Sequence, residues 1–379
     1  MHAFTRYATE KQAEIIALIK EMVECESPSN SPADVNRFVD LMVEKTKDIA
    51  VAQTIRSERY GKHLRLEFNL PGRKKKGQIL GLGHSDTVWP LGTLNTMPAR
   101  VHDGRLWGPG VLDMKAGLAF FIYAIRALRE IDVAVARRVA LLIVSDEEVG
   151  SETSRHVTEA EAKQSDYVLV VEPGTGLAGQ LKTARKGVGN YTVSIEGRAS
   201  HAGVDFSNGA SAILEAARQI ERIAGFTDLK RGITVNPGVI SGGTRTNVVA
   251  AQARVEVDIR VVRLKDAEVL DKKFRALRPV DKRCKIRIEG SLNRPPMERA
   301  RAIAKLFAKA KKMGSKLGID VEESSTGGGS DGNFTAALGV PTLDGLGAVG
   351  EGAHAVNESI LVDRIADRVA LLAMLIAEL

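Results

Sequence analysis

Residues 78–86 read QILGLGHSD, a short apolar run that ends in a histidine and an aspartate two positions apart. An apolar run of this length is typical of a strand buried on both faces, as in the parallel sheets of α/β proteins. In such sheets ligands bind beyond the carboxyl ends of the strands. His84 and Asp86 therefore stand where an α/β protein would carry a binding site, with both side chains on one side of the chain.

The segments around this run repeat the pattern. Two more apolar runs end in acidic residues, RVALLIVSDEE (138–148) and YVLVVEP (167–173), and a helical stretch at 115–129 separates the first run from the second. Amphipathic spacing predicts further helices, and a last short apolar run is GVPTLDGLG (339–347). These helices span residues 11–23, 33–46, 298–317 and 359–378. We therefore predict an α/β fold with a mostly parallel central sheet.

From residue 182 the pattern changes to long alternating strands. Strands are predicted at 187–198, 232–243, 251–262 and 284–292, with helices at 209–224 and 265–277. Together they indicate one α+β unit with a four-stranded antiparallel sheet and two helices. We expect this domain, residues 182–295, to be inserted into a domain made of residues 1–181 and 296–379.

Length and composition fit a two-domain globular protein of 379 residues with 44% apolar content. No apolar stretch is long enough to span a membrane, and the N-terminus lacks the pattern of a secretory signal, so we expect a cytoplasmic protein. The net charge of +7 would suit nucleic acid or anionic substrates, but aromatic residues are only 4%, too few for a base-stacking surface. The basic run at 73–76 is most simply a solvated hairpin turn.

Histidine and acidic residues gather at the predicted strand ends. Taken alone, each has a simpler explanation: a structural histidine, a helix N-cap at Asp113, or a solvated loop at Glu147 and Glu148. Five sites at the mouth of one sheet instead indicate a functional cluster. These sites are His84 with Asp86, Asp113, Glu147 with Glu148, Glu172 and His354.

Two imidazoles with three or four carboxylates, and no thiolate, suit zinc, cobalt or manganese. One carboxylate can bridge two such ions, and a spare glutamate can then act as a general base. Because consecutive residues tend to point in different directions, Glu147 and Glu148 are more plausibly divided between base and ligand than used as a chelating pair.

Short motifs recur in order along nearly the whole chain. They are GHSDTV (83–88), GPGVLDMKAG (108–117), SDEEVGS (145–151), VEPG (171–174), GRASHAG (197–203), GGTRTN (242–247), DIR (258–260) and TGGGSDGN (326–333), followed by His354. Taken together, these motifs resemble those of the M20 family of co-catalytic zinc hydrolases, and within it the glutamate carboxypeptidases.

The resemblance implies a site with two zinc ions, or cobalt or manganese in their place. His84, Asp113 and Glu172 would bind one ion, and Asp113, Glu148 and His354 the other, so that Asp113 bridges. Asp86 would orient His84, and Glu147 would take a proton from water and pass it to the leaving amine. The family also implies a cis peptide bond between Asp113 and Met114.

For the inserted domain, the resemblance implies dimerisation and a lid over the site. His201 would reach across a homodimer to polarise the scissile carbonyl, Asn247 would contact substrate, and Arg294 would hold the substrate's α-carboxylate. The glycines at 327–329 could bring backbone N–H groups to the substrate. They lack the motif of a phosphate-binding loop.

We therefore expect a metal-dependent hydrolase that cleaves an amide or peptide bond and releases a C-terminal amino acid, with glutamate favoured. The alternative within this class is an N-acyl amino acid deacylase or desuccinylase, of the acetylornithine deacetylase or succinyl-diaminopimelate desuccinylase type. Two competing readings, a nucleic-acid-binding protein and a relative that has lost activity, are disfavoured, the second because every catalytic motif position is filled.

Overall fold

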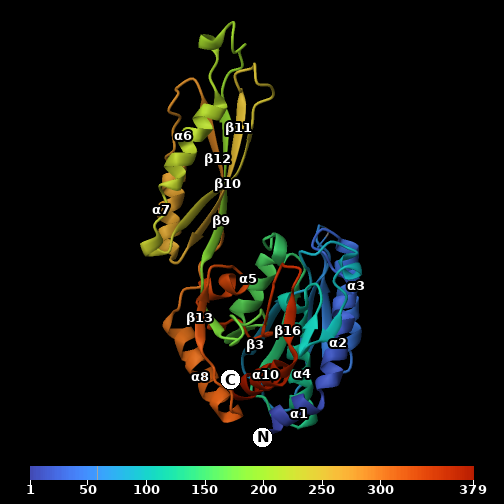
Figure 1. The fold of residues 1–379 in the computed structure, drawn as a ribbon. Coiled ribbons are helices and arrows are strands. Elements are labelled where there is room, and N and C mark those ends of the chain that lie inside the picture. The colour runs from blue at the N-terminus through green and yellow to red at the C-terminus, as the bar shows by residue number, and fades with distance from the viewer. Residues whose placement is uncertain (58) are drawn as a thin grey trace. The chain divides into compact units, whose positions relative to one another are not determined.

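The computed structural model describes residues 1–57 and 59–379, which form two compact units (Figure 1). The first unit contains Met1–Ala184, Arg299–Thr326 and Ser330–Leu379. The inserted unit contains Arg185–Glu298 and Gly327–Gly329. Each unit has its own hydrophobic core, so each is described by itself.

The first unit is built on a six-stranded sheet with strand order β1-β2-β6-β3-β7-β14. Strands β6, β3, β7 and β14 run parallel to one another, whereas β2 is antiparallel to β1 and to β6. The predicted mostly parallel α/β sheet is confirmed. The strands are β1 (Ala50–Ile55), β2 (His63–Phe68), β3 (Gln78–His84), β6 (Arg138–Val144), β7 (Tyr167–Val170) and β14 (Thr342–Leu343).

Helices cover both faces of this sheet. Alternate residues of β3 enter different cores: Ile79 lies in the large core with α1, α2, α3, α4, α8 and α10, whereas Leu80 and Leu82 pack in a smaller core with α5. Burial on both faces explains the continuous apolar run of β3. The helices are α1 (Ala3–Glu10), α2 (Gln12–Glu24), α3 (Pro32–Thr46), α4 (Ala116–Glu130), α5 (Arg155–Lys163), α8 (Arg301–Leu317), α9 (Gly332–Ala337) and α10 (Ile365–Glu378).

The prediction of a hairpin turn at residues 73–76 is wrong. Strands β2 and β3, which flank this basic run, are not neighbours, because β6 lies between them and pairs with both. The run is a connection that passes the end of β6, and Arg73, Lys74 and Lys76 are exposed. The basic run is solvent-exposed, as predicted, but the two strands that flank it do not pair with each other.

Several short elements have no counterpart in the predictions. A small sheet of order β15-β16-β5-β4 forms beside the main sheet, and β16 occupies the first residues of the predicted helix at 359–378. Its strands are β4 (Arg100–His102), β5 (Arg105–Trp107), β15 (Gly350–Glu351) and β16 (Ser359–Leu361). A further pair joins β8 (Leu181–Arg185) to β13 (Glu323–Thr326).

The inserted unit has a four-stranded antiparallel sheet of order β10-β11-β9-β12, and two helices pack on one face of it (Figure 1). In its core Tyr191 stacks on Phe274 with a centroid separation of 4.0 Å. The predicted α+β arrangement is confirmed. Its elements are β9 (Gly187–Glu196), α6 (Ala212–Ala224), β10 (Thr234–Gly242), β11 (Gln252–Val261), α7 (Leu264–Arg275) and β12 (Lys285–Arg294).

Over the described residues, the helices are all too short or too polar to cross a lipid bilayer.

Candidate active site

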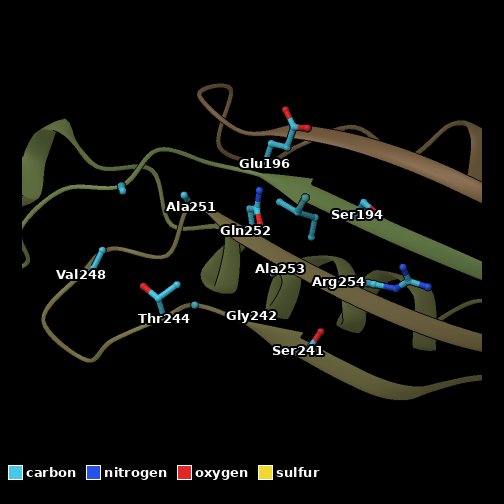
Figure 2. A pocket seen from close by; sticks show the side chains of 13 residues that line it. Ser194, Glu196, Ser241, Gly242, Thr244, Val248, Ala251, Gln252, Ala253 and Arg254 are labelled. Carbon is cyan, nitrogen blue, oxygen red and sulfur yellow. The ribbon is translucent and has the colours of Figure 1, made fainter.

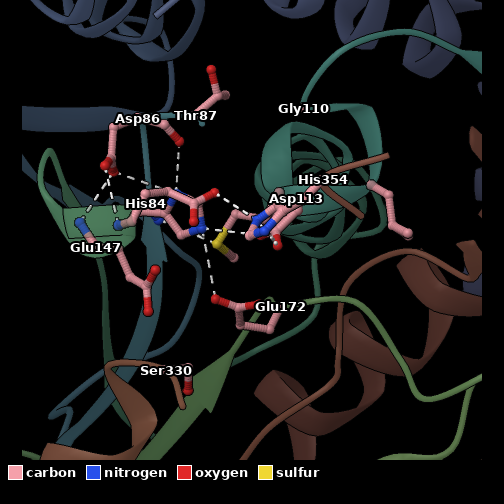
Figure 3. A network of polar contacts seen from close by, with 12 residues as sticks. His84, Asp86, Thr87, Gly110, Asp113, Glu147, Glu172, Ser330 and His354 are labelled. Atoms are coloured by element: carbon pink, nitrogen blue, oxygen red, sulfur yellow. Dashed lines mark hydrogen bonds and ion pairs between the residues drawn. The ribbon is translucent and has the colours of Figure 1, made fainter. Parts of the chain in front are cut away.

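The first candidate ligand, His84, is the last residue of β3 and is almost completely buried. Its Nδ1 lies 2.9 Å from the carbonyl oxygen of Asp86, which fixes the ring and directs Nε2 towards two carboxylates (Figure 3). Nε2 lies 3.2 Å from Asp113 Oδ1 and 3.7 Å from Glu172 Oε1. Burial lowers the pKa of His84, but hydrogen bonds to Asp113 and Asp86 outweigh it and hold the pKa well above its usual value.

The carboxylate of Asp86 has a second task. One oxygen lies 3.5 Å from His84 Nδ1 and accepts the N–H of Glu147, and the other accepts the N–H of Glu148 and the hydroxyl of Ser29. The turn Glu147–Val149, which follows β6, is thereby tied to the end of β3. Asp86 thus lies between His84 and the two glutamates and holds both segments.

Asp113 lies between the two imidazoles. It belongs to the turn Val111–Lys115, which precedes α4, and its peptide bond to Met114 is cis, as the resemblance implied. Asp113 Oδ1 lies 3.2 Å from His84 Nε2, and Oδ2 lies 3.4 Å from His354 Nε2. Burial raises the pKa of Asp113, but the hydrogen bonds to both histidines prevail and hold it far below its usual value.

His354 and Glu148 complete the other side of the cluster. His354 Nε2 lies 3.2 Å from Glu148 Oε1, and hydrogen bonds to Asp113 and Glu148 raise the pKa of His354 to about 10. Burial raises the pKa of Glu148. A divalent cation held between this imidazole nitrogen and the carboxylates would take the place of the imidazole proton, because it would neutralise the same negative charges.

These side chains form two overlapping ligand groups, and Asp113 belongs to both. The ligand atoms within each group lie within 4.8 Å of one another. Two imidazoles and three carboxylates fit zinc, cobalt or manganese, which accept nitrogen and oxygen ligands. The groups are His84, Asp113 and Glu172, and Asp113, Glu148 and His354, the same two sets that the sequence resemblance implies.

Glu147 lies beside the cluster but belongs to neither ligand group found among the described residues. Its negative charge is close enough to contribute to the raised pKa of His84. Figure 3 shows its side chain extending from the turn after β6, on the side of the cluster where Ser330 lies.

The three other predicted residues, His201, Asn247 and Arg294, belong to the inserted unit. His201 follows β9, is exposed, and accepts the N–H groups of Gly203 and Val204 at Nδ1. The carbonyl of Asn247 accepts the N–H of Ala202, so Asn247 lies beside the His201 segment. Both residues therefore occupy one end of the unit.

Arg294 occupies the other end. It is buried as the last residue of β12, where it pairs with Val188 near the start of β9, and an added Cβ on Gly329 would come within 2.8 Å of its side chain. Residues 188 and 196 are separated by most of β9, roughly 25 Å at the usual rise of a strand. The structure therefore does not bring His201 and Arg294 of one chain together.

Glu358 was missed by the sequence analysis although it adjoins the cluster. Its carboxylate accepts the backbone N–H of Asp113. The only sequence signal is an acidic residue four positions after His354, in HAVNE, at the start of a short apolar segment. Such a residue is ordinarily a solvated loop glutamate.

Comparison with known proteins places these features in context. The sequence model of the peptidase family M20/M25/M40 matches residues 81–378. Carboxypeptidase G2 from Pseudomonas sp. (strain RS-16) is 29% identical over 98% of this chain and 91% of its own length. A succinyl-diaminopimelate desuccinylase from Psychrobacter sp. (strain PRwf-1) is also 29% identical, over 75% of this chain and 74% of its own. The crystal structure of aminopeptidase PepT from Bacillus cereus superposes with a TM-score of 0.81 at 25% identity, covering 97% of this chain and 98% of that one.

Proposed function

Because this chain belongs to the peptidase family M20/M25/M40, it is a metal-dependent hydrolase, and we propose that it releases a C-terminal amino acid, preferably glutamate, from N-acyl or peptidyl substrates. The observation that carries the proposal is the pair of overlapping ligand groups that share Asp113, with Glu147 beside them. The preference for glutamate is supported by the similarity to carboxypeptidase G2, which is 29% identical over 98% of the chain.

The metals would be two zinc ions, or cobalt or manganese, held by the two ligand groups with Asp113 between them. When bound, they supply Lewis-acid polarisation of the substrate carbonyl and make water a stronger acid. His84 keeps Nε2 directed into the site because its Nδ1 is held by Asp86. The depressed pKa of Asp113 keeps its carboxylate ionised, as a residue that would hold a metal ion requires.

Glu147 would be the general base. Because Asp86 accepts the N–H groups of both Glu147 and Glu148, the turn is fixed while the two side chains take different directions. Glu148 reaches His354. The carboxylate of Glu147 would take a proton from the attacking water and deliver it to the leaving nitrogen.

The inserted unit would supply the substrate contacts and the dimer interface. A buried guanidinium at Arg294 suits the α-carboxylate that every C-terminal amino acid carries. His201 and Asn247 lie at the opposite end of the unit from Arg294, which supports a homodimer in which they serve the partner's site. Exposed apolar side chains near that end, among them Phe206 and Ile240, support the same conclusion.

A pocket of about 720 Å³ lies at the same end of the inserted unit. Figure 2 shows that the ends of β9, β10 and β11 line it. Its lining includes Glu196, Thr244 and Arg254. A shaped surface beside the loop that holds Asn247 supports the proposal that this end meets a second copy of the chain.

A desuccinylase is the second candidate. It is favoured by the 29% identity to succinyl-diaminopimelate desuccinylase, which is as high as the identity to carboxypeptidase G2 but extends over less of the chain. Both reactions would use the same metal cluster and differ in the groups on either side of the scissile bond.

The test is hydrolysis of a substrate panel by protein loaded with zinc, cobalt or manganese. We expect N-acyl and peptidyl glutamates to be cleaved faster than N-succinyl amino acids. Glu147→Gln should lower kcat by about 100- to 10,000-fold while the bound metal per chain is unchanged, because the residue moves a proton and holds no metal.

Glu152→Gln is the control, because Glu152 is an exposed glutamate a few residues further along the chain and pairs with Arg59. It should retain wild-type activity. Faster cleavage of N-succinyl substrates would select the desuccinylase, and loss of metal from Glu147→Gln would contradict the role of Glu147.

A further inference from the structure

Glu358 is a buried carboxylate with an unusually complete set of partners. Only 1% of its surface is exposed. Oε1 accepts the backbone N–H of Leu112 at 2.9 Å and of Asp113 at 3.1 Å. Oε2 accepts the backbone N–H of Gly110 at 2.8 Å and the indole N–H of Trp89 at 2.7 Å. Four donors fill the acceptor positions of an ionised carboxyl group.

Three of these four donors lie in one short segment, from Gly110 to Asp113. The segment begins at Gly110, whose backbone is left-handed, and ends at Asp113. The two carboxylate oxygens of Asp113 face His84 and His354. Glu358 therefore holds the backbone of Asp113 itself and of the residues just before it. The direction of the Asp113 side chain depends on that backbone.

Glu358 also belongs to the segment that carries His354. Its N–H donates to the carbonyl of Ala355, and its own carbonyl accepts the N–H of Gly108 at 3.4 Å. The next residues form β16, which pairs with β5 in the register Ser359 to Trp107. Glu358 thus connects, by both side chain and backbone, the segment that carries Asp113 and the segment that carries His354. These two segments meet where Asp113 Oδ2 lies 3.4 Å from His354 Nε2.

We propose that Glu358 is a positioning residue that sets the separation of Asp113 and His354 and thereby the affinity of the site for its second metal ion. The inference rests on the metal cluster of the proposed function and adds a residue that binds neither metal nor substrate. Partners of this kind typically change metal affinity by about 10- to 100-fold when they are altered.

Glu358→Gln is an isosteric test. Each carboxylate oxygen accepts two N–H groups, so whichever oxygen becomes an amide nitrogen will face two donors instead of accepting from them. Glu358→Asp keeps the charge and both acceptors but is one methylene shorter, so it should restore part of the effect.

Glu26→Gln is the matched control. Glu26 is a half-buried carboxylate that also accepts two backbone N–H groups, from Gly92 and Leu94, in a neighbouring loop. It touches no residue of the metal cluster among the contacts of the described chain. If any loss of a loop-binding carboxylate weakened metal binding, this variant would show it.

The experiment measures the affinity of the full-length protein for zinc by competition with a chromophoric chelator, at about pH 8.5. The same pH and buffer are used for every variant, so that the affinities can be compared directly. The visible absorption of the cobalt-loaded protein reports the ligand geometry separately. The thermal unfolding of each metal-free variant gives its folding stability.

We expect Glu358→Gln to bind the weaker-held zinc ion about 10- to 100-fold less tightly and to have a changed cobalt spectrum. The zinc affinity of Glu358→Asp should lie between those of Glu358→Gln and the wild type. Glu26→Gln should match the wild type in both measurements. Unchanged zinc affinity and cobalt spectrum in Glu358→Gln, with only a lower melting temperature, would overturn the proposal. If Glu358→Gln does not fold, wild-type affinity in Glu358→Asp would overturn it. Because no substrate is present, an error in the proposed substrate does not affect the result.

Discussion

At the scale of single residues, most of the cluster can be predicted from sequence. His84 and Glu172 each end an apolar run, and the family motifs imply the remaining ligands Asp113, Glu148 and His354. Glu358 could not be predicted, since its task is to accept N–H groups from residues about 245 or more positions away along the chain. Nearly every residue has a backbone N–H group, so no sequence motif shows which of them will donate to Glu358.

His63 is a second residue whose setting is visible only in the structure. It is buried at the start of β2, where Nδ1 accepts the N–H of Ser145 at 3.2 Å and Nε2 lies 3.3 Å from Thr153 Oγ1. Burial lowers the pKa of His63 below its usual value. The sequence analysis assigned it no chemical role, and the contacts fit a neutral structural imidazole.

This lowered pKa predicts a loss of stability in acid. His63 binds a proton more tightly in the unfolded chain than in the folded one. Its contribution to the free energy of unfolding is therefore present above about pH 6.5 and is lost as the pH falls through the pKa of His63 in the folded protein. We expect His63→Asn, whose amide oxygen can accept the Ser145 N–H, to lose less stability than the wild type between about pH 7.5 and about pH 5.5.

The measurement is urea unfolding of the metal-free proteins at both pH values. The metal cluster is the same in both proteins, so the difference isolates His63. His102→Asn, at an exposed histidine, should keep the wild-type dependence. An equal loss in His63→Asn and the wild type would contradict the prediction.

At the scale of elements, the long strands and helices follow from hydrophobic periodicity and the short ones do not. β4, β15 and β16 have two or three residues each, too few for a period to be recognised. The position of β6 between β2 and β3 is also hidden, because that pairing depends on residues about 70 positions apart. The error at residues 73–76 has this cause.

Two glycines place the end of β7 and with it Glu172. A Cβ added to Gly117, at the start of α4, would lie 2.0 Å from the carbonyl oxygen of Val171, and one added to Gly347 would lie 2.1 Å from the same atom. The backbone just before Glu172 is therefore enclosed from both sides. Neither glycine has a positive φ, so close approach is the reason that glycine is required at these positions.

Gly117→Ala should consequently destabilise the protein by about 3 kcal/mol, because the strand end must shift to admit the methyl group. Urea unfolding at equal m-value measures the change. Gly203→Ala is the control, since the nearest atoms to its added Cβ are 3.8 Å away, and it should cost less than about 0.5 kcal/mol. A Gly117→Ala protein as stable as the control would show that the helix and strand adjust freely.

At the scale of the whole molecule, the proposed homodimer predicts complementation between inactive subunits. A hybrid of one Glu147→Ala subunit and one His201→Ala subunit, purified through two different tags, should have about half the wild-type activity per dimer. One of its sites would combine an intact Glu147 with the partner's intact His201.

A hybrid of Glu147→Ala with the double variant Glu147→Ala/His201→Ala is the control and should remain inactive, because neither site retains Glu147. If the first hybrid is also inactive, His201 does not act across the dimer. If His201→Ala alone is as active as the wild type, the residue has no part in the reaction.

The order of the segments along the chain has a consequence for biosynthesis. His84, Asp113, Glu148 and Glu172 all precede the inserted unit, and His354 follows it. A ribosome therefore delivers four ligands first, then the whole inserted unit, and only afterwards the histidine that closes the second ligand group. The second ligand group therefore cannot form on a nascent chain until the whole inserted unit has left the ribosome.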